Sequence, residues 1–324
     1  MTPEFGLGLR GDLEFAGYAR VGREAERRGF DVVTAFGDLG FLPPFPILLA
    51  IAAVTERVRL GPSCVNPYTS HPVEIAGQLA ALDAASAGRA YLGLARGAWL
   101  EAIGLAQPRP LRAIRETWEI TQKLLRGDTS GYAGELFDVA PGFALRHPIL
   151  RPQVPLLIGT WGERTAALAG EIASELKVGG SANPDLVPVM RRRLAGPGTR
   201  TGLVFGAVTV VDADRTAARA LARSRVAMYF DVVAPHDPTL ELPPRLLEDL
   251  RAALAAGAHE AAGRLIPEDL LDRFAFAGTP EDVVARCRAL FDAGVKRVEF
   301  GVPWGLTTDE GLRWLGDKVL PTFR

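Results

Sequence analysis

A glycine-rich stretch that runs straight into a helix-like segment is the clearest candidate for ligand chemistry in this sequence. Its residues are Gly159, Thr160, Trp161 and Gly162. A loop of this kind leaves several backbone N–H groups of the following helix without partners, and the positive end of the helix dipole lies behind them. A phosphate suits that spot, and Gly179 and Gly180 would complete the cradle. A tight turn that needs small residues explains the same stretch equally well.

A second loop combines residues that would shape a pocket for a planar ring. It contains Ser63, Cys64, Asn66, Tyr68 and His71. The proline after Asn66 disfavours the helical conformation there, and the proline after His71 suits the first position of a helix. A strand that ends at Ser63 and Cys64, directly before such a turn, suggests a backbone bulge that presses against the ring. For His71, capping or surface packing is the alternative to ligand binding.

Two charged residues follow other strand-like runs. Asp38 lies between two glycines and is either a helix cap or a group that handles a proton. Arg96 either pairs with an acid near the same pocket or holds the anionic part of a ligand. Together these residues indicate a pocket, but they do not specify a reaction.

Short apolar runs alternate with helix-length amphipathic runs along the chain, which is typical of a parallel sheet wrapped by helices. The predicted strands are 5–9, 31–35, a strand that begins at 58–60, 90–94, 155–159, 175–178, 203–211 and 297–300. The predicted helices are 13–28, 45–55, 72–85, 112–125, 163–173, 213–228, 280–293 and 309–315. Each candidate loop follows one of these strands, as active-site loops do in α/β barrels. Eight such units favour a closed (β/α)8 TIM barrel over a doubly wound sheet. The glycine fingerprint typical of a doubly wound dinucleotide-binding sheet is also missing, because Gly6 and Gly8 are not followed by a helix-opening glycine.

The length of 324 residues fits one such barrel with an insertion. We therefore predict a single domain over 1–324. The segment at about 230–272 is rich in Pro, Leu and Ala and does not show the alternation of strands and helices. We therefore predict that it is an insertion before the last unit. The loop-rich segment 127–154 is expected to form a hairpin or a lid.

The composition excludes several classes of partner. With 37 basic and 38 acidic residues and no dominant charged block, neither nucleic acid nor an anionic membrane is expected as the main partner. Two distant cysteines, Cys64 and Cys287, form neither a disulfide framework nor a metal cluster, so no metal is expected. The sequence has no signal-like start and no run of about 18 apolar residues, so we expect a cytoplasmic protein.

Several stretches taken as a set resemble a known superfamily. They are 60–72, 82–83, 88–97, 155–159, 169–171, 276–282, 293–295 and 319–321. Their order and content are similar to the luciferase-like monooxygenase superfamily, closest to its coenzyme F420-dependent branch, which includes methylenetetrahydromethanopterin reductase. The resemblance spans nearly the whole chain, and it implies a TIM barrel of the bacterial-luciferase type.

The same resemblance implies a deazaflavin or flavin lying across the barrel mouth. Its phosphate would sit on the loop 159–162, with help near Gly179 and Gly180. A non-prolyl cis peptide bond between Ser63 and Cys64 would support the ring, and Asn66 and Tyr68 would border the same pocket.

The sequence also departs from the family pattern. Leu39 stands where a histidine commonly follows the aspartate, and Ala98 stands where an acid often follows Arg-Gly. Ser63 replaces a frequent glycine, and the run 177–180, Lys-Val-Gly-Gly, replaces Ala-Asp-Gly. The cofactor cradle is therefore retained better than the acid–base groups, and the pterin substrate of the reductase is not carried over.

The sequence leaves three alternative functions. The first is an F420-dependent oxidoreductase that moves a hydride between the deazaflavin and a small organic substrate, with Asp38 beside the ring and Trp99 and Trp161 as pocket walls. The second is an FMN-dependent monooxygenase in which reduced flavin reacts with oxygen. The third, motivated by the missing histidine and acid, is a cofactor-binding barrel without catalysis. A homodimer is expected, for which the apolar run 45–53 offers a face; burial under the insertion explains that run equally well.

Overall fold

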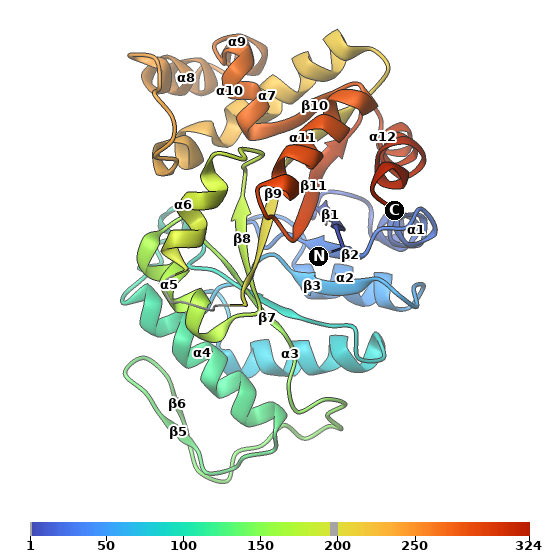
Figure 1. The fold of residues 1–324 in the computed structure, drawn as a ribbon. Helices are drawn as coiled ribbons and strands as arrows, with labels where there is room; N and C mark the ends of the chain where they lie inside the picture. The colour runs from blue at the N-terminus through green and yellow to red at the C-terminus, as the bar shows by residue number, and fades with distance from the viewer. Residues whose placement is uncertain (1, 195–199) are drawn as a thin grey trace.

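Eight parallel strands close into a barrel in the computed structural model, which describes residues 2–194 and 200–324 (Figure 1). The strands are β1 (Glu4–Leu9), β2 (Val32–Ala35), β3 (Arg59–Pro62), β4 (Leu92–Leu94), β7 (Leu156–Gly159), β8 (Glu175–Gly179), β9 (Gly202–Val211) and β11 (Arg297–Trp304). Their order is β3-β2-β1-β11-β9-β8-β7-β4, and bridges between Leu60 and Ala90 and between Val65 and Leu94 join β3 to β4. The predicted TIM barrel is confirmed, and all eight predicted strands are present.

Helices cover the outside of this barrel. They include α1 (Phe15–Arg27), α2 (Pro44–Ala52), α3 (Pro72–Ala85), α4 (Pro110–Leu125), α5 (Glu163–Ile172), α6 (Leu186–Arg193), α7 (Arg215–Val233), α11 (Pro280–Asp292) and α12 (Thr308–Trp314). Outward-facing strand residues such as Phe5, Leu7 and Leu9 are fully buried beneath them. Short helical turns η3 (Leu315–Val319) and η4 (Leu320–Phe323) follow α12, and η1 (Leu100–Ile103) lies in the loop after β4. Helix α6 was not among the predicted elements.

The inward face of the barrel depends on glycine. Alternate residues of a strand point to the same side, and on β1, β3 and β9 several of the inward ones are glycine. A Cβ at Gly61 would lie 2.5 Å from the ring of Tyr91, and one at Gly6 would lie 3.1 Å from the side chain of Glu299. The missing side chains therefore make room for large polar side chains from other strands.

The segment predicted as an insertion is helical. It contains η2 (Ala234–His236), α8 (Leu246–Ala255), α9 (His259–Arg264) and most of α10 (Glu268–Phe274), while its first residues continue α7. These helices pack on α7 around a second apolar cluster that includes Phe230 and Phe274, and they lie together at the top of Figure 1. The short strand β10 (Ala275–Gly278) then pairs with β9 beyond the end of β8. It was not among the predicted elements.

A hairpin forms within the loop-rich segment before β7, so the hairpin prediction is confirmed. Strands β5 (Tyr132–Ala133) and β6 (Asp138–Val139) pair antiparallel. The buried carboxylate of Glu116 on α4 accepts hydrogen bonds from the amides of Glu135, Leu136 and Phe137 at 2.8, 3.0 and 3.1 Å. The hairpin is thus fastened to α4 on the outside of the barrel.

The apolar run in α2 is mostly buried within this chain. Phe45, Ile47, Leu48 and Ile51 are buried, and α2 packs on α1, α3 and the strands beneath it. The suggestion that the insertion covers this run was wrong, because the run lies under neighbouring barrel helices. Among the described residues, no helix is long and apolar enough to cross a membrane.

Candidate cofactor-binding and active site

Loops from three strands meet around Cys64 at the barrel mouth, where the carboxyl ends of the strands lie. A Cβ at Gly37, in the loop after β2, would lie 2.2 Å from the carbonyl oxygen of Cys64. A Cβ at Gly159, at the end of β7, would lie 2.8 Å from the Cys64 Sγ. Both glycines are needed for this close approach, so the loops that carry Asp38, Cys64 and Gly159 form one wall.

The peptide bond between Ser63 and Cys64 is cis and non-prolyl, as the resemblance implied. Hydrogen bonds fix the chain on both sides of it. The Ser63 amide donates to the Ala35 carbonyl at 2.8 Å, and the Val65 amide donates to the Gly93 carbonyl at 3.0 Å. This edge of the mouth is therefore held to β2 and β4.

The rest of the loop after β3 forms a compact turn against β4. The side-chain oxygen of Asn66 accepts from the amides of Tyr68 and Thr69, both at 3.0 Å. The hydroxyl of Tyr68 donates to the Pro108 carbonyl, and Arg96 is exposed beside it. The Nδ1 of His71 accepts from the Val73 amide at the start of α3, so His71 is a helix cap.

The loop after β7 offers an anion fewer amides than predicted. The amide of Thr160 donates to the Lys177 carbonyl, that of Gly162 to the Thr160 hydroxyl, and that of Gly180 to the Gly206 carbonyl. Helix α5, however, has no side-chain cap at its N-terminus. An anion at this loop would therefore be held by the first turn of α5 rather than by the glycine amides.

Two features leave room for a ligand beside that loop. A Cβ at Gly179 would have no heavy atom within 4 Å, so the backbone is open there. The indole N–H of Trp161 donates to the Gly179 carbonyl at 2.8 Å and holds this part of the wall in place. Trp99, the other predicted wall residue, is 45% exposed. Open backbone next to an uncapped helix fits the phosphate end of a flavin-like cofactor.

Asp38 is half-buried at this mouth. Burial raises the pKa of its carboxyl above the ordinary value, and the positive charges of Arg10 and Lys177 partly oppose that shift. The same burial raises the pKa of the Cys64 thiol to about 11, which keeps it protonated at neutral pH. Burial eases protonation of Asp38 and hinders ionisation of the Cys64 thiol, so Asp38 is the better candidate of the two for proton exchange.

The upper ionic cluster, formed by Lys177, Glu299, Thr34 and Ser63, was missed by sequence reasoning. Lys177 on β8 and Glu299 on β11 form a buried ion pair. The Lys177 Nζ also donates to the Ser63 Oγ at 2.8 Å, and the Thr34 hydroxyl donates to Glu299 Oε1 at 3.1 Å. The available signal was the two charged residues at alternate positions of each of two buried strands, Glu175 and Lys177 on β8 and Arg297 and Glu299 on β11.

The lower ionic cluster, near the opposite end of the barrel, is formed by Glu175, Arg297, Arg59, Lys296 and Glu4. Arg297 is fully buried, and its Nη1 lies 2.7 Å from Glu175 Oε2. Glu175 also lies 2.8 Å from Lys296 Nζ and 3.6 Å from Arg59 Nη1. Burial by itself would raise the pKa of Glu175, but these three cations lower it to about 2.

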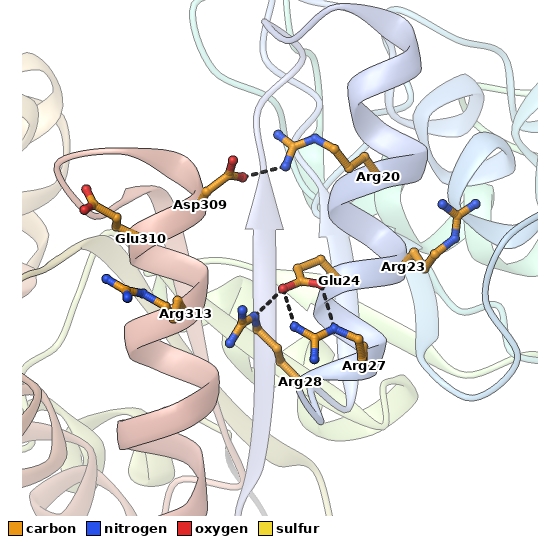
Figure 2. Close-up of a pocket in the computed structure, with 8 residues that line it drawn as sticks. All are labelled: Arg20, Arg23, Glu24, Arg27, Arg28, Asp309, Glu310 and Arg313. Atoms are coloured by element: carbon orange, nitrogen blue, oxygen red, sulfur yellow. Dashed lines mark hydrogen bonds and ion pairs between the residues drawn. The ribbon is translucent and has the colours of Figure 1, made fainter.

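Two surface hollows lie away from the mouth. One, of about 560 Å³, runs between α1 and α12 and is lined by Arg20, Arg23, Glu24, Arg27, Arg28, Asp309, Glu310 and Arg313 (Figure 2). The other, of about 450 Å³, lies at the base near Arg59 and Arg324. Several of their charges pair with one another, as Arg20 does with Asp309. Neither hollow contains a residue predicted for the site.

Comparisons with known proteins agree with this geometry. The luciferase-like monooxygenase family model matches residues 3–297. A 5,10-methylenetetrahydromethanopterin reductase of Methanopyrus kandleri is 27% identical over 99% of this chain and 98% of its own length. The enzyme of the same name from Archaeoglobus fulgidus is 28% identical over 99% of this chain and 100% of its own.

Solved structures give the same picture. The coenzyme F420-dependent tetrahydromethanopterin reductase of Methanopyrus kandleri superposes with a TM-score of 0.90, covers all of both chains and is 26% identical. The monooxygenase RslO1 of Streptomyces bottropensis superposes with a TM-score of 0.74 at 21% identity over 99% of this chain and 100% of its own, which shows a shared fold.

Proposed function

Because the chain belongs to the luciferase-like monooxygenase family, we propose that it is a coenzyme F420-dependent oxidoreductase that acts on a small organic substrate. The observation that carries this proposal is the full-length match, with a TM-score of 0.90, to an F420-dependent reductase. The cis peptide bond at Ser63–Cys64 and the open backbone at Gly179 support it.

The residues of the mouth divide into a phosphate end and a ring end. The first turn of α5 and the loop 159–162, with Gly179 and Gly180, would hold the phosphate. Ser63, Cys64, Asn66, Tyr68 and Arg96 would border the ring. When bound, F420 supplies the carbon that accepts or gives up a hydride, and the protein supplies orientation and a fixed electrostatic environment.

Asp38 is our candidate for proton handling at this site. Its pKa is raised by burial, so it reaches the neutral form more easily than an exposed aspartate. Leu39 and Ala98, the positions where a histidine and an acid were expected, cannot take that role, because neither side chain ionises. Asp38 would therefore do alone what the family pattern shares among several groups.

Comparison of two cofactors on the purified apoprotein tests this proposal. Fluorescence titration should show saturable binding of F420, and FMN should bind at least about tenfold more weakly, which corresponds to about 1.4 kcal/mol. An F420-linked absorbance assay with 5,10-methylenetetrahydromethanopterin and with simple alcohols and aldehydes would then search for the substrate. Tight binding of FMN without binding of F420 would overturn the proposal in favour of a flavin-dependent monooxygenase.

A further inference from the structure

The upper ionic cluster is more than a packing feature, because it reaches the barrel mouth. The Nζ of Lys177 bonds to Ser63, the residue on one side of the cis peptide bond. It also lies 5.1 Å from the ring centroid of Phe36, which directly follows β2. Ser63 and Phe36 both stand where a strand ends, so the ammonium group lies at the floor of the mouth.

Stability does not explain this ion pair. The side chains of Lys177 and Glu299 are 8% and 1% exposed, and taking both charges out of water costs several kcal/mol per ion. Replacement of such pairs by apolar residues is often neutral or stabilising. Glu299 Oε2 is buried without a hydrogen-bond partner among the described residues, as are the three guanidinium nitrogens of Arg297 in the lower cluster. The upper pair differs from the lower cluster by its contact with Ser63 at the mouth.

The positive charge of Lys177 acts on two ionisable groups of the mouth, Asp38 and Cys64. Burial raises the pKa of Asp38 and of Cys64, and Lys177 lowers both. The charged groups that face this region are Glu299 on β11, Arg10 after β1, and Asp38 itself. The ammonium group contacts Ser63 at the mouth, and the Glu299 side chain lies beside Gly6, Gly8 and Gly206.

We propose that Lys177 is a positioning residue that holds a fixed positive charge beneath the ring of the bound cofactor and favours its reduced form. This role rests on the proposed function. In the hydride step a C–H bond of the substrate would break, the hydrogen would pass with both electrons to a ring carbon, and Asp38 would take up the proton that the oxidised substrate releases. The substrate would be oxidised, and the ring would be reduced and gain negative charge. A buried cation near that charge stabilises it more than water would.

Binding of the two redox forms of F420 without turnover tests this role. Under anaerobic conditions, Lys177→Met should weaken binding of reduced F420 about tenfold or more, and binding of oxidised F420 by less than about threefold. Lys177→Arg should restore most of the preference, because it keeps the charge. The change in the ratio of the two Kd values is equivalent to a change in the midpoint potential of the bound cofactor.

Two further variants keep the test decisive. The double variant Lys177→Met with Glu299→Gln removes both charges and should fold if Lys177→Met alone does not. It should also lose the preference for reduced F420. Glu175→Gln is the matched control, since it neutralises another buried, ion-paired residue on the inward face of β8, and it should keep the wild-type ratio.

The outcomes separate the two proposals. A wild-type ratio of Kd values in folded Lys177→Met, or in the folded double variant, would overturn the role of Lys177 and leave the proposed function standing. Failure of the wild-type protein to bind F420 in either form would overturn the proposed function and this role with it.

Discussion

The two ionic clusters inside the barrel use the same kinds of side chain but differ in their redundancy. In the lower cluster, Glu175 faces three cations, so its charge is compensated several times over. In the upper cluster, Lys177 and Glu299 have no other ionic partner within 4.0 Å among the described residues. Both clusters occupy space left by inward-facing glycines.

This difference indicates different roles. A charge network at the end of the barrel away from the loops holds strand ends together, and in α/β barrels that face contributes to stability. A single ion pair whose ammonium group reaches Ser63 at the mouth is well placed to act on a ligand. Buried charge thus has a structural use at one end of this barrel and, as we propose, a functional use at the other.

The largest expected effect on stability comes from the lower cluster. Glu175→Leu should lower the free energy of unfolding by about 3–5 kcal/mol, because it leaves the fully buried Arg297 without its nearest carboxylate. Urea denaturation measures this change. The double variant Glu175→Leu with Arg297→Met should recover most of the loss, since it removes both buried charges. A loss below about 1 kcal/mol in the single variant would remove the distinction between the clusters.

Lowering the pH is expected to have a smaller effect on the stability of the protein. The folded pKa of Glu175 is about 2, below its ordinary value of 4.5, so its contribution to stability is fully present above pH 4.5 and is lost as the pH falls towards 2. By pH 3 we expect a loss of about 2 kcal/mol from this group alone. Unfolding curves of the wild type and Glu175→Gln between pH 6 and 3 measure it by difference. If the free energy of unfolding fell equally with pH in the two proteins, Glu175 would not be the source of the loss.

The architecture could be predicted from the sequence because helices and strands each produce a regular spacing of apolar residues. Each strand alternates with a helix whose apolar face packs on it, and both leave a repeating pattern in the residues. The eight strands were predicted for this reason. The helices α8 to α10 were predicted only as an insertion, because each is short and is stabilised by packing on α7 rather than by its own pattern.

The site was only partly predictable. Asp38, Ser63, Cys64 and Gly159 were noted because they lie in loops after strands, and the structure brings them to one mouth. Lys177 and Glu299 were not recognised as a pair, since their strands are far apart in sequence and only the closed barrel brings them together. The amides that already donate within the loop after β7 were also invisible, because hydrogen-bond partners depend on three-dimensional contacts.

The most direct test of the central claim is a crystal structure of the protein with F420. The account predicts the ring at the barrel mouth against the Ser63–Cys64 edge, its phosphate at the start of α5, and the Lys177 ammonium group beneath the ring. Electron density for the cofactor in the groove between α1 and α12, or at the base near Arg59, with an empty mouth would contradict it.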